Sequence, residues 1–293
     1  EKLEQKSQGD PQTRLLMILS FHPCYVGDEN RLCAGRDPDA QDRARMRAAR
    51  AVILPQGCRR SLFEAAAANC ARVFPDYRAR FAWPDKTGQI RLFRHCGLPH
   101  PDTAVFEALA QYRRSNAPGR LPAGFDPPFV FKYNGAGEGD HVWRVDHLQA
   151  FQRLLVMSEQ WESTGQHGFL IQEYIETGGR CLRVAVIGDT LVSYWRIQQA
   201  PGNFRTAAAL GADIDHLAFP ELQAAGKQQV RRLCAHTGIN LAGVDLIFSE
   251  TEPGRGPLML EINYFFGRRG LGGSERFYEL LCREIDHWIT KTG

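Results

Sequence analysis

The chain has 293 residues, of which 43% are hydrophobic and 24% are charged, a composition typical of a globular protein with a substantial core. Its formal net charge of +3 argues against a dedicated nucleic-acid-binding protein, and no apolar run is long enough for a membrane span. Residues 1–11 are polar and lack the apolar core of a secretory signal, so we expect a cytoplasmic protein that binds neither nucleic acid nor membranes. The eight cysteines include no CxxC pair, and we therefore expect no zinc site and no disulfide framework.

The first part of the chain predicts a small α/β unit that ends at residue 84. Short apolar runs predict buried strands at Leu15–Ser20 and Ala51–Leu54. A basic helical stretch lies between them within residues 41–50, and the alanine-rich segment Leu62–Val73 predicts a second helix.

The remaining chain alternates helices with strands and predicts a mixed α/β (α+β) fold, with one lobe over residues 85–168 and another over 169–293. The periodicity predicts helices at Lys86–His95, Val105–Arg114, Asp146–Ser158 (capped by Asp146), Glu221–His236 and Ser274–Thr290. Apolar runs predict strands at Phe129–Tyr133, Val142–Val145, Phe169–Ile175, Leu182–Gly188, Leu191–Ile197, Ala242–Phe248 and Leu258–Asn263.

Acidic and amide side chains interrupt the last two apolar strands. Asp245 lies in AGVDLIF, and Glu261 and Asn263 lie two residues apart in LMLEIN, so the latter two share a face. A hairpin that is symmetric about Pro253 places Asp245 opposite Glu261. Two facing carboxylates need a cation or an arginine between them, and the oxygen ligands suit Mg²⁺. The alternative is a strand whose polar face meets solvent.

One of the six lysines occupies a position that suggests phosphate binding. Lys132 lies inside an apolar strand, and Gly135, Gly137 and Gly139 follow it, so backbone N–H groups of the turn can approach phosphate oxygens. The segment matches neither the P-loop nor the dinucleotide-binding pattern, and a simple hairpin turn is the alternative. Another of the six, Lys86, lies in the first turn of a predicted helix, where a surface lysine is common, so it indicates no function by itself.

Arginines accompany the strands that precede this hairpin. Arg183 and Arg196 lie on two predicted strands with hydrophobic flanks, and Arg205 follows in GNFRTAAALG. A buried guanidinium needs an anionic partner from the protein or from a ligand, whereas an arginine whose head reaches water does not.

Taken in order, these segments resemble the ATP-grasp superfamily, in particular its ribosomal-protein glutamate ligases and glutathione-synthetase-like enzymes. The resemblance covers about residues 85 to 290. It rests on DK…GLPHPDT, PFVFKYNGAGEG, LIQEYI, LRVAVIGD with SYWR and FRT, AGVDLIF and LMLEIN.

The resemblance implies an ATP-grasp fold preceded by a small α/β domain, and an ATP-dependent carboxylate–amine ligase that forms an acyl phosphate. It implies that Lys86 and Lys132 contact ATP phosphates beneath the turn containing Gly135, Gly137 and Gly139, and that Arg183 belongs to the nucleotide site. It implies that the adenine contacts Gln172, Glu173, Tyr174 and Ile175. It implies that the catalytic arginines are Arg196 and Arg205. It also implies that Mg²⁺ or Mn²⁺ binds to Asp245, Glu261 and Asn263.

The chain departs from the family pattern at three places. Cys181 stands where the family has an Asp two residues before its Arg, Ala207 replaces the Asn of R-x-N, and Tyr264–Gly267 replaces Ser-Pro-Gly. Because the lysines and the metal ligands are retained, we expect an active enzyme with a different carboxylate and amine, either small molecules or peptides. A nucleotide-binding regulator without catalysis, a small-molecule kinase and a homo-oligomer remain open alternatives at this stage.

Overall fold

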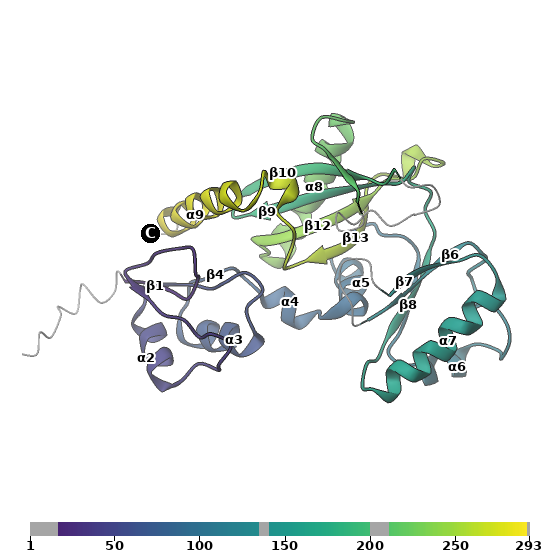
Figure 1. The fold of residues 1–293 in the computed structure, drawn as a ribbon, viewed down its shortest axis with the longest axis horizontal. Coiled ribbons are helices and arrows are strands. Elements are labelled where there is room, and N and C mark those ends of the chain that lie inside the picture. Colours follow the sequence, from purple (N-terminus) through teal and green to yellow (C-terminus); the bar gives the residue numbers. More distant parts are fainter. Residues whose placement is uncertain (1–16, 135–140, 200–210, 292–293) are drawn as a thin grey trace, which may run out of the picture.

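A computed structural model describes residues 17–134, 141–199 and 211–291 of the chain. The described residues form three sheets with flanking helices (Figure 1). The fold is mixed α/β, as predicted. None of the helices in these ranges combines the length and the apolar composition that a membrane span requires.

The first sheet is parallel and four-stranded, and it belongs to the N-terminal unit. Its strands in spatial order are β2 (Glu29–Asn30), β1 (Ile18–Ser20), β3 (Ala51–Ile53) and β4 (Val73–Phe74). Its helices are α2 (Ala40–Ala48), α3 (Arg60–Asn69) and α4 (Arg78–Ala82). The predicted strands at β1 and β3 are confirmed within the described residues. The helix predicted over Leu62–Val73 ends earlier, because Val73 pairs with Val52 as part of a strand.

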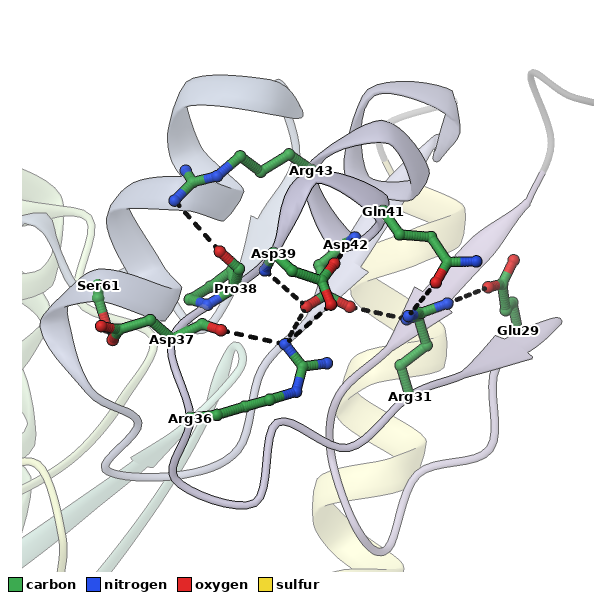
Figure 2. Close-up of polar contacts among 10 residues, drawn as sticks. All are labelled: Glu29, Arg31, Arg36, Asp37, Pro38, Asp39, Gln41, Asp42, Arg43 and Ser61. Carbon is green, nitrogen blue, oxygen red and sulfur yellow. Dashed lines mark hydrogen bonds and ion pairs between the residues drawn. The ribbon is translucent and has the colours of Figure 1, made fainter.

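A buried carboxylate organises the loop between β2 and α2 (Figure 2). Asp42 is fully buried and accepts hydrogen bonds from Arg31 Nε at 2.8 Å and from Arg36 Nη1 at 2.5 Å. It also closes a capping box with Asp39 at the start of α2. Burial alone would raise the pKa of Asp42, but the hydrogen bonds from Arg36, the Asp39 backbone and Arg31 lower it to about 2.

The second sheet forms the small lobe. Its strands in spatial order are β5 (Thr103–Phe106), β8 (Phe169–Glu173), β6 (Phe129–Tyr133) and β7 (Val142–Val145). The helices of this part are α5 (Asp85–His95), α6 (Leu109–Ser115) and α7 (Leu148–Ser163). Strand β8 thus pairs within the small lobe, although the predicted division assigned residues 169–173 to the C-terminal lobe.

Two local predictions in this lobe are wrong. The helix expected over Val105–Arg114 begins only at Leu109, because the preceding residues pair with β8 as strand β5. The cap of α7 is His147, whose side chain accepts from the backbone of Ala150, and not Asp146.

The third sheet is antiparallel and five-stranded. Its strands in spatial order are β11 (Asp213–Asp215), β10 (Thr190–Ile197), β9 (Arg180–Ile187), β12 (Leu241–Ile247) and β13 (Leu258–Asn263). Two long helices and two short 3₁₀ turns accompany it, namely α8 (Pro220–Thr237), α9 (Ser274–Lys291), η2 (Pro253–Arg255) and η3 (Arg269–Leu271).

The two faces of this sheet have different coverings. On one face Leu182 and Val184 pack with residues of α8, including Val230, in one core cluster. On the opposite face, Ala185 and Ile187 pack with α9 and with β1 and β3 of the N-terminal unit. Figure 1 shows α9 extending from the large sheet over the N-terminal unit. The second face therefore has one end covered by α9 and the N-terminal sheet.

Candidate active site

Polar side chains gather on the uncovered part of that second face. The face carries alternate residues of four adjacent strands, which are Cys181, Arg183, Tyr194, Arg196, Asp245, Glu261 and Asn263. Asp245 pairs with Glu261 on one side and with Arg183 on the other, so the hairpin register predicted from the sequence is confirmed. A bulge between Asp245 and Leu246 shifts the register of the hairpin beyond that pair.

Two arginines bind the carboxylate of Asp245, so it does not face Glu261 without a counter-ion. Its Oδ1 lies 2.5 Å from Arg183 Nε and 2.8 Å from Arg196 Nη2, and its Oδ2 accepts from Arg183 Nη2 at 2.9 Å. All three side chains are about nine-tenths buried or more. Burial alone would raise the pKa of Asp245, but the two guanidinium groups lower it. The cluster is thus a charge-compensated network in which Asn263 Nδ2 also donates to Oδ2 at 3.2 Å.

Arg196 retains an unused donor at the cavity wall. Its Nη2 contacts Asp245 and Cys181 Sγ, but its buried Nε has no hydrogen-bond partner among the described residues. A buried N–H without a partner costs free energy, which a bound anion would recover. Arg196 therefore has one buried donor available for a ligand, and its catalytic role stays a prediction.

Lys132 and Lys86 approach the same face from the other lobe. Lys132 lies on β6 with 9% of its surface exposed, and Lys86 lies in the first turn of α5. Burial lowers the pKa of Lys132 to about 8, Glu261 opposes this shift and Lys86 adds to it. The structure therefore brings both lysines together with Glu261 around one cavity.

The segment predicted to contact adenine forms the apolar end of this cavity. Gln172 is buried and its Nε2 donates to Thr103 Oγ1 at 2.8 Å. Arg255 donates two hydrogen bonds of 2.6 Å to the carboxylate of Glu173, and these bonds lower the pKa of Glu173. Tyr174 and Ile175 follow, and the apolar walls around this segment are Val130, Leu170, Ile247 and Leu260.

The cavity has a volume of about 280 Å³ and joins both lobes. Six of its lining side chains are basic and three are acidic, which leaves three net positive charges. Such an excess, enclosed by apolar walls at one end, suits a ligand with a flat apolar group and several phosphates.

Sequence reasoning missed several lining residues. Gln89 lies three residues after Lys86, and its side chain exchanges hydrogen bonds with the backbone of Ile262 at 2.8 and 2.9 Å. Tyr194 lies two residues before Arg196 on the same strand face, a spacing that already indicated its position. Nothing in the sequence indicated Gln89, because its partner is distant in the chain.

Several predicted residues lie outside the described residues. These are Gly135, Gly137, Gly139 and Arg205.

The oxygen atoms of Glu261 and Asn263 fit a hard divalent cation that takes its remaining ligands from phosphate and water. Within residues 17–134, 141–199 and 211–291, no three His, Cys, Asp or Glu side chains are grouped as a metal cage. Glu261 and Asn263 nevertheless offer carboxylate and amide oxygens from one strand face, next to the lysines. Mg²⁺ is usually held in this way, by one or two carboxylates, water and substrate phosphates.

Comparison with protein families gives a match over most of the chain. The profile of the RimK-like ATP-grasp domain matches residues 85–277. A probable alpha-L-glutamate ligase of Xanthomonas campestris pv. campestris (strain B100) is 34% identical over 149 residues, which are 50% of this chain and 47% of the relative. A probable alpha-L-glutamate ligase of Xylella fastidiosa (strain M12) is 34% identical over 147 residues, covering 50% and 45%. The chain thus spans about half the length of the curated relatives it matches.

Solved structures share the fold at low sequence identity. D-cycloserine synthetase DcsG aligns with a TM-score of 0.59 at 15% identity over 93% of this chain and 99% of its own. A RimK domain protein ATP-grasp from Sphaerobacter thermophilus aligns with a TM-score of 0.54 at 16% identity over 80% of each chain. D-alanine–D-alanine ligase from Bacillus anthracis has a TM-score of 0.51 at 14% identity, covering 73% and 71%.

Proposed function

The chain belongs to the RimK-like ATP-grasp family, and on that premise we propose that it is an ATP-dependent ligase that joins a carboxylate to an amine. The observation that carries the proposal is the cavity itself, in which Lys86, Lys132 and Arg196 surround one end of an apolar-walled space. The names of the matching relatives, alpha-L-glutamate ligases, support the same reaction class.

The first step transfers the terminal phosphoryl group of ATP to a carboxylate oxygen of the acid, which gives an acyl phosphate and ADP. Lys86 and Lys132 bind the phosphates, and the unpaired Nε of Arg196 binds a transferring or acyl-phosphate oxygen. Such phosphoryl transfer depends on positioning and on neutralising charge, which these cations supply. The adenine lies between Gln172–Ile175 and the apolar side chains Val130, Leu170, Ile247 and Leu260.

In the second step the amine nitrogen attacks the acyl carbon. The carbon–oxygen bond to phosphate breaks, inorganic phosphate leaves, and the nitrogen loses a proton to solvent as the amide forms. Glu261 and Asn263 would hold Mg²⁺ or Mn²⁺, which neutralises phosphate charge when bound. Asp245 was predicted as a third metal ligand; because Arg183 and Arg196 bind its carboxylate, we propose that it acts chiefly by holding these two arginines.

The domain boundaries, the substrates and the compartment are also part of the proposal. We assign residues 1–84 to a separate N-terminal domain that contributes to substrate binding, and residues 85–293 to the two ATP-grasp lobes, with β8 in the first of them. The substrates are small molecules or peptides in the cytoplasm. Gly135, Gly137, Gly139 and Arg205 are assigned to phosphate contacts by the family pattern alone.

The proposal is tested by incubating the protein with ATP, Mg²⁺, pooled carboxylic acids and hydroxylamine as a generic amine. We expect ADP and a hydroxamate to form together, and removal of pool members one at a time then identifies the acid. Formation of ADP with a stable phosphorylated product and no hydroxamate would instead show a kinase.

A further inference from the structure

The loop after β13 lines the end of the cavity that lies away from the segment proposed to contact adenine. Residues that pair across neighbouring strands form rows on this face of the sheet. The row that contains Asp245 is followed by the row of Asn263, Gly243 and Ala185. Strand β13 ends at Asn263, and the loop after β13 begins there. This loop lies on the side opposite the apolar adenine end. The part of the cavity beside this loop is called the acceptor end, and it is lined by Phe265, Phe266, Gly267, Arg269 and Gly270 of the loop and by Tyr194, which lies against Gly270.

Phe265 presents an aromatic ring to this end. Its surface is 71% exposed although it lines the cavity. The ring lies against Gly57 of the N-terminal unit, since a Cβ added to Gly57 would be 3.3 Å from Phe265 Cδ2. Phe265 thus stands between the N-terminal unit and the cavity with most of its ring available for contact with a ligand.

Tyr194 and Gly270 form a closed apolar wall beside it. Tyr194 is 3% exposed, and a Cβ added to Gly270 would lie only 2.2 Å from the ring carbon Cζ of Tyr194. Gly270 therefore permits the loop after β13 to pack directly on the ring. Ile214 and Phe266 pack in the same apolar cluster as Tyr194.

Arg269 is a cation at this end without a carboxylate partner among the described residues. Its neighbour Arg268 differs in its contacts, because its guanidinium lies 4.4 Å from the centre of the Tyr278 ring and 5.0 Å from that of Phe277. Arg268 also donates to Ser274 Oγ at 3.3 Å. Of these two adjacent arginines, only Arg269 faces the cavity.

On the basis of the proposed ligase function, we propose that the acceptor end binds the amine co-substrate, and that this is an amino acid or peptide with an apolar side chain. Arg269 binds its carboxylate, and Phe265 contacts its side chain. Its amine then points toward the Asp245 row, where the acyl group is activated. Glutamate fits less well, because its second carboxylate would meet the apolar wall of Tyr194 and Phe266.

The experiment measures binding by calorimetry to the full chain saturated with adenylyl imidodiphosphate and Mg²⁺. Leucine, leucinamide and glutamate are the probes, because leucinamide lacks the carboxylate and glutamate lacks the apolar side chain. We expect leucine to bind about tenfold or more tightly than either other probe, as the loss of one charge-assisted hydrogen bond predicts. Arg269→Gln should abolish the difference between leucine and leucinamide, and Phe265→Ala should weaken leucine binding.

Arg268→Gln is the matched control, since it removes the same charge from the adjacent residue, and it should preserve the preference for leucine. Equal binding of leucine and leucinamide to the unaltered protein, tighter binding of glutamate, or no binding of leucine while the nucleotide analogue binds would each overturn the inference. Absence of nucleotide binding would overturn the proposed function itself, and the inference with it.

Discussion

Arg196 reaches across strand β9 to Asp245, so that its Nη2 lies 2.8 Å from Asp245 Oδ1 although the two residues belong to strands that do not pair. Arg183 on the intervening strand binds the same carboxylate through two nitrogens. The carboxylate of one strand therefore fixes the guanidinium groups of the next two strands of the sheet. This arrangement gives Asp245 a positioning role that the sequence alone did not indicate.

Asp245→Asn should both destabilise the protein and reduce catalysis. The change leaves two buried guanidinium groups without a counter-ion, so we expect the free energy of unfolding to fall by about 3–5 kcal/mol. ADP formation should fall about 100-fold or more, because Arg196 loses its fixed orientation. Urea denaturation and the hydroxamate assay measure the two effects. Asp213→Asn, at an exposed residue of β11, serves as the control and should change neither. An unchanged stability of Asp245→Asn would contradict the assigned network.

Nucleotide affinity should depend on pH through Lys132. The pKa of Lys132 is lowered to about 8, so the side chain is a cation below that pH and becomes neutral above it. We therefore expect the dissociation constant of adenylyl imidodiphosphate to increase as the pH rises through about 8. Lys132→Arg keeps the charge over this range and should give a flat profile between pH 7 and pH 9. Identical profiles for the two proteins would show that another group controls the affinity.

Glu261→Gln should uncouple turnover from Mg²⁺ while leaving the fold intact. Glu261 is only partly buried, and the change removes the negative charge that a divalent cation requires. We expect a loss of Mg²⁺-dependent ADP formation of about 100-fold, with an unfolding midpoint close to that of the unaltered protein. Titration of activity with Mg²⁺ and a denaturation curve provide the measurement. Normal activity of this variant would remove Glu261 from the metal site.

Asp42→Asn should affect stability without affecting the cavity. Asp42 is fully buried and accepts from two arginines, so the free energy of unfolding at pH 7 should fall by about 2 kcal/mol. The pKa of Asp42 is about 2 in the folded state, below its ordinary value of 3.8. The stabilisation is present above pH 4 and is lost as the pH falls through about 2, so the two proteins should converge in acid.

Glu64→Gln, at an exposed ion pair with Arg60, is the control for this prediction and should shift stability by less than about 0.5 kcal/mol. Nucleotide binding should be the same in all three proteins. A difference between Asp42→Asn and the unaltered protein that persists at pH 2 would show that the carboxylate charge is not the cause.

Much of the site was predictable because it lies on strands. The alternation of Glu261 and Asn263, and the symmetry of the hairpin about Pro253, were sufficient to place Asp245 opposite Glu261. The partner of that carboxylate pair could not be chosen from the sequence, because an arginine and a metal ion satisfy the same charges. The register of β9 places Arg183 beside Asp245, so an arginine binds that carboxylate, and the metal at Glu261 stays a prediction.

The errors have a common physical origin in tertiary pairing. Val105 and Phe106 of strand β5 were predicted as helix although both residue types favour strands, because they directly precede a helical pattern; pairing with β8 determines the outcome. Strand β4 was hidden at the end of a predicted helix for the same reason. The contact of Phe265 with Gly57 was not predicted, because it forms only when the N-terminal unit packs on the large lobe.

The transfer of a carboxylate oxygen to phosphate tests the central claim most directly. The acid identified in the hydroxamate screen is labelled with ¹⁸O in both carboxyl oxygens and is incubated with the protein, ATP, Mg²⁺ and the amine. An acyl-phosphate ligase breaks the bond between the acyl carbon and one labelled oxygen, so we predict one ¹⁸O atom in each inorganic phosphate released. Inorganic phosphate without the label would contradict the proposed reaction.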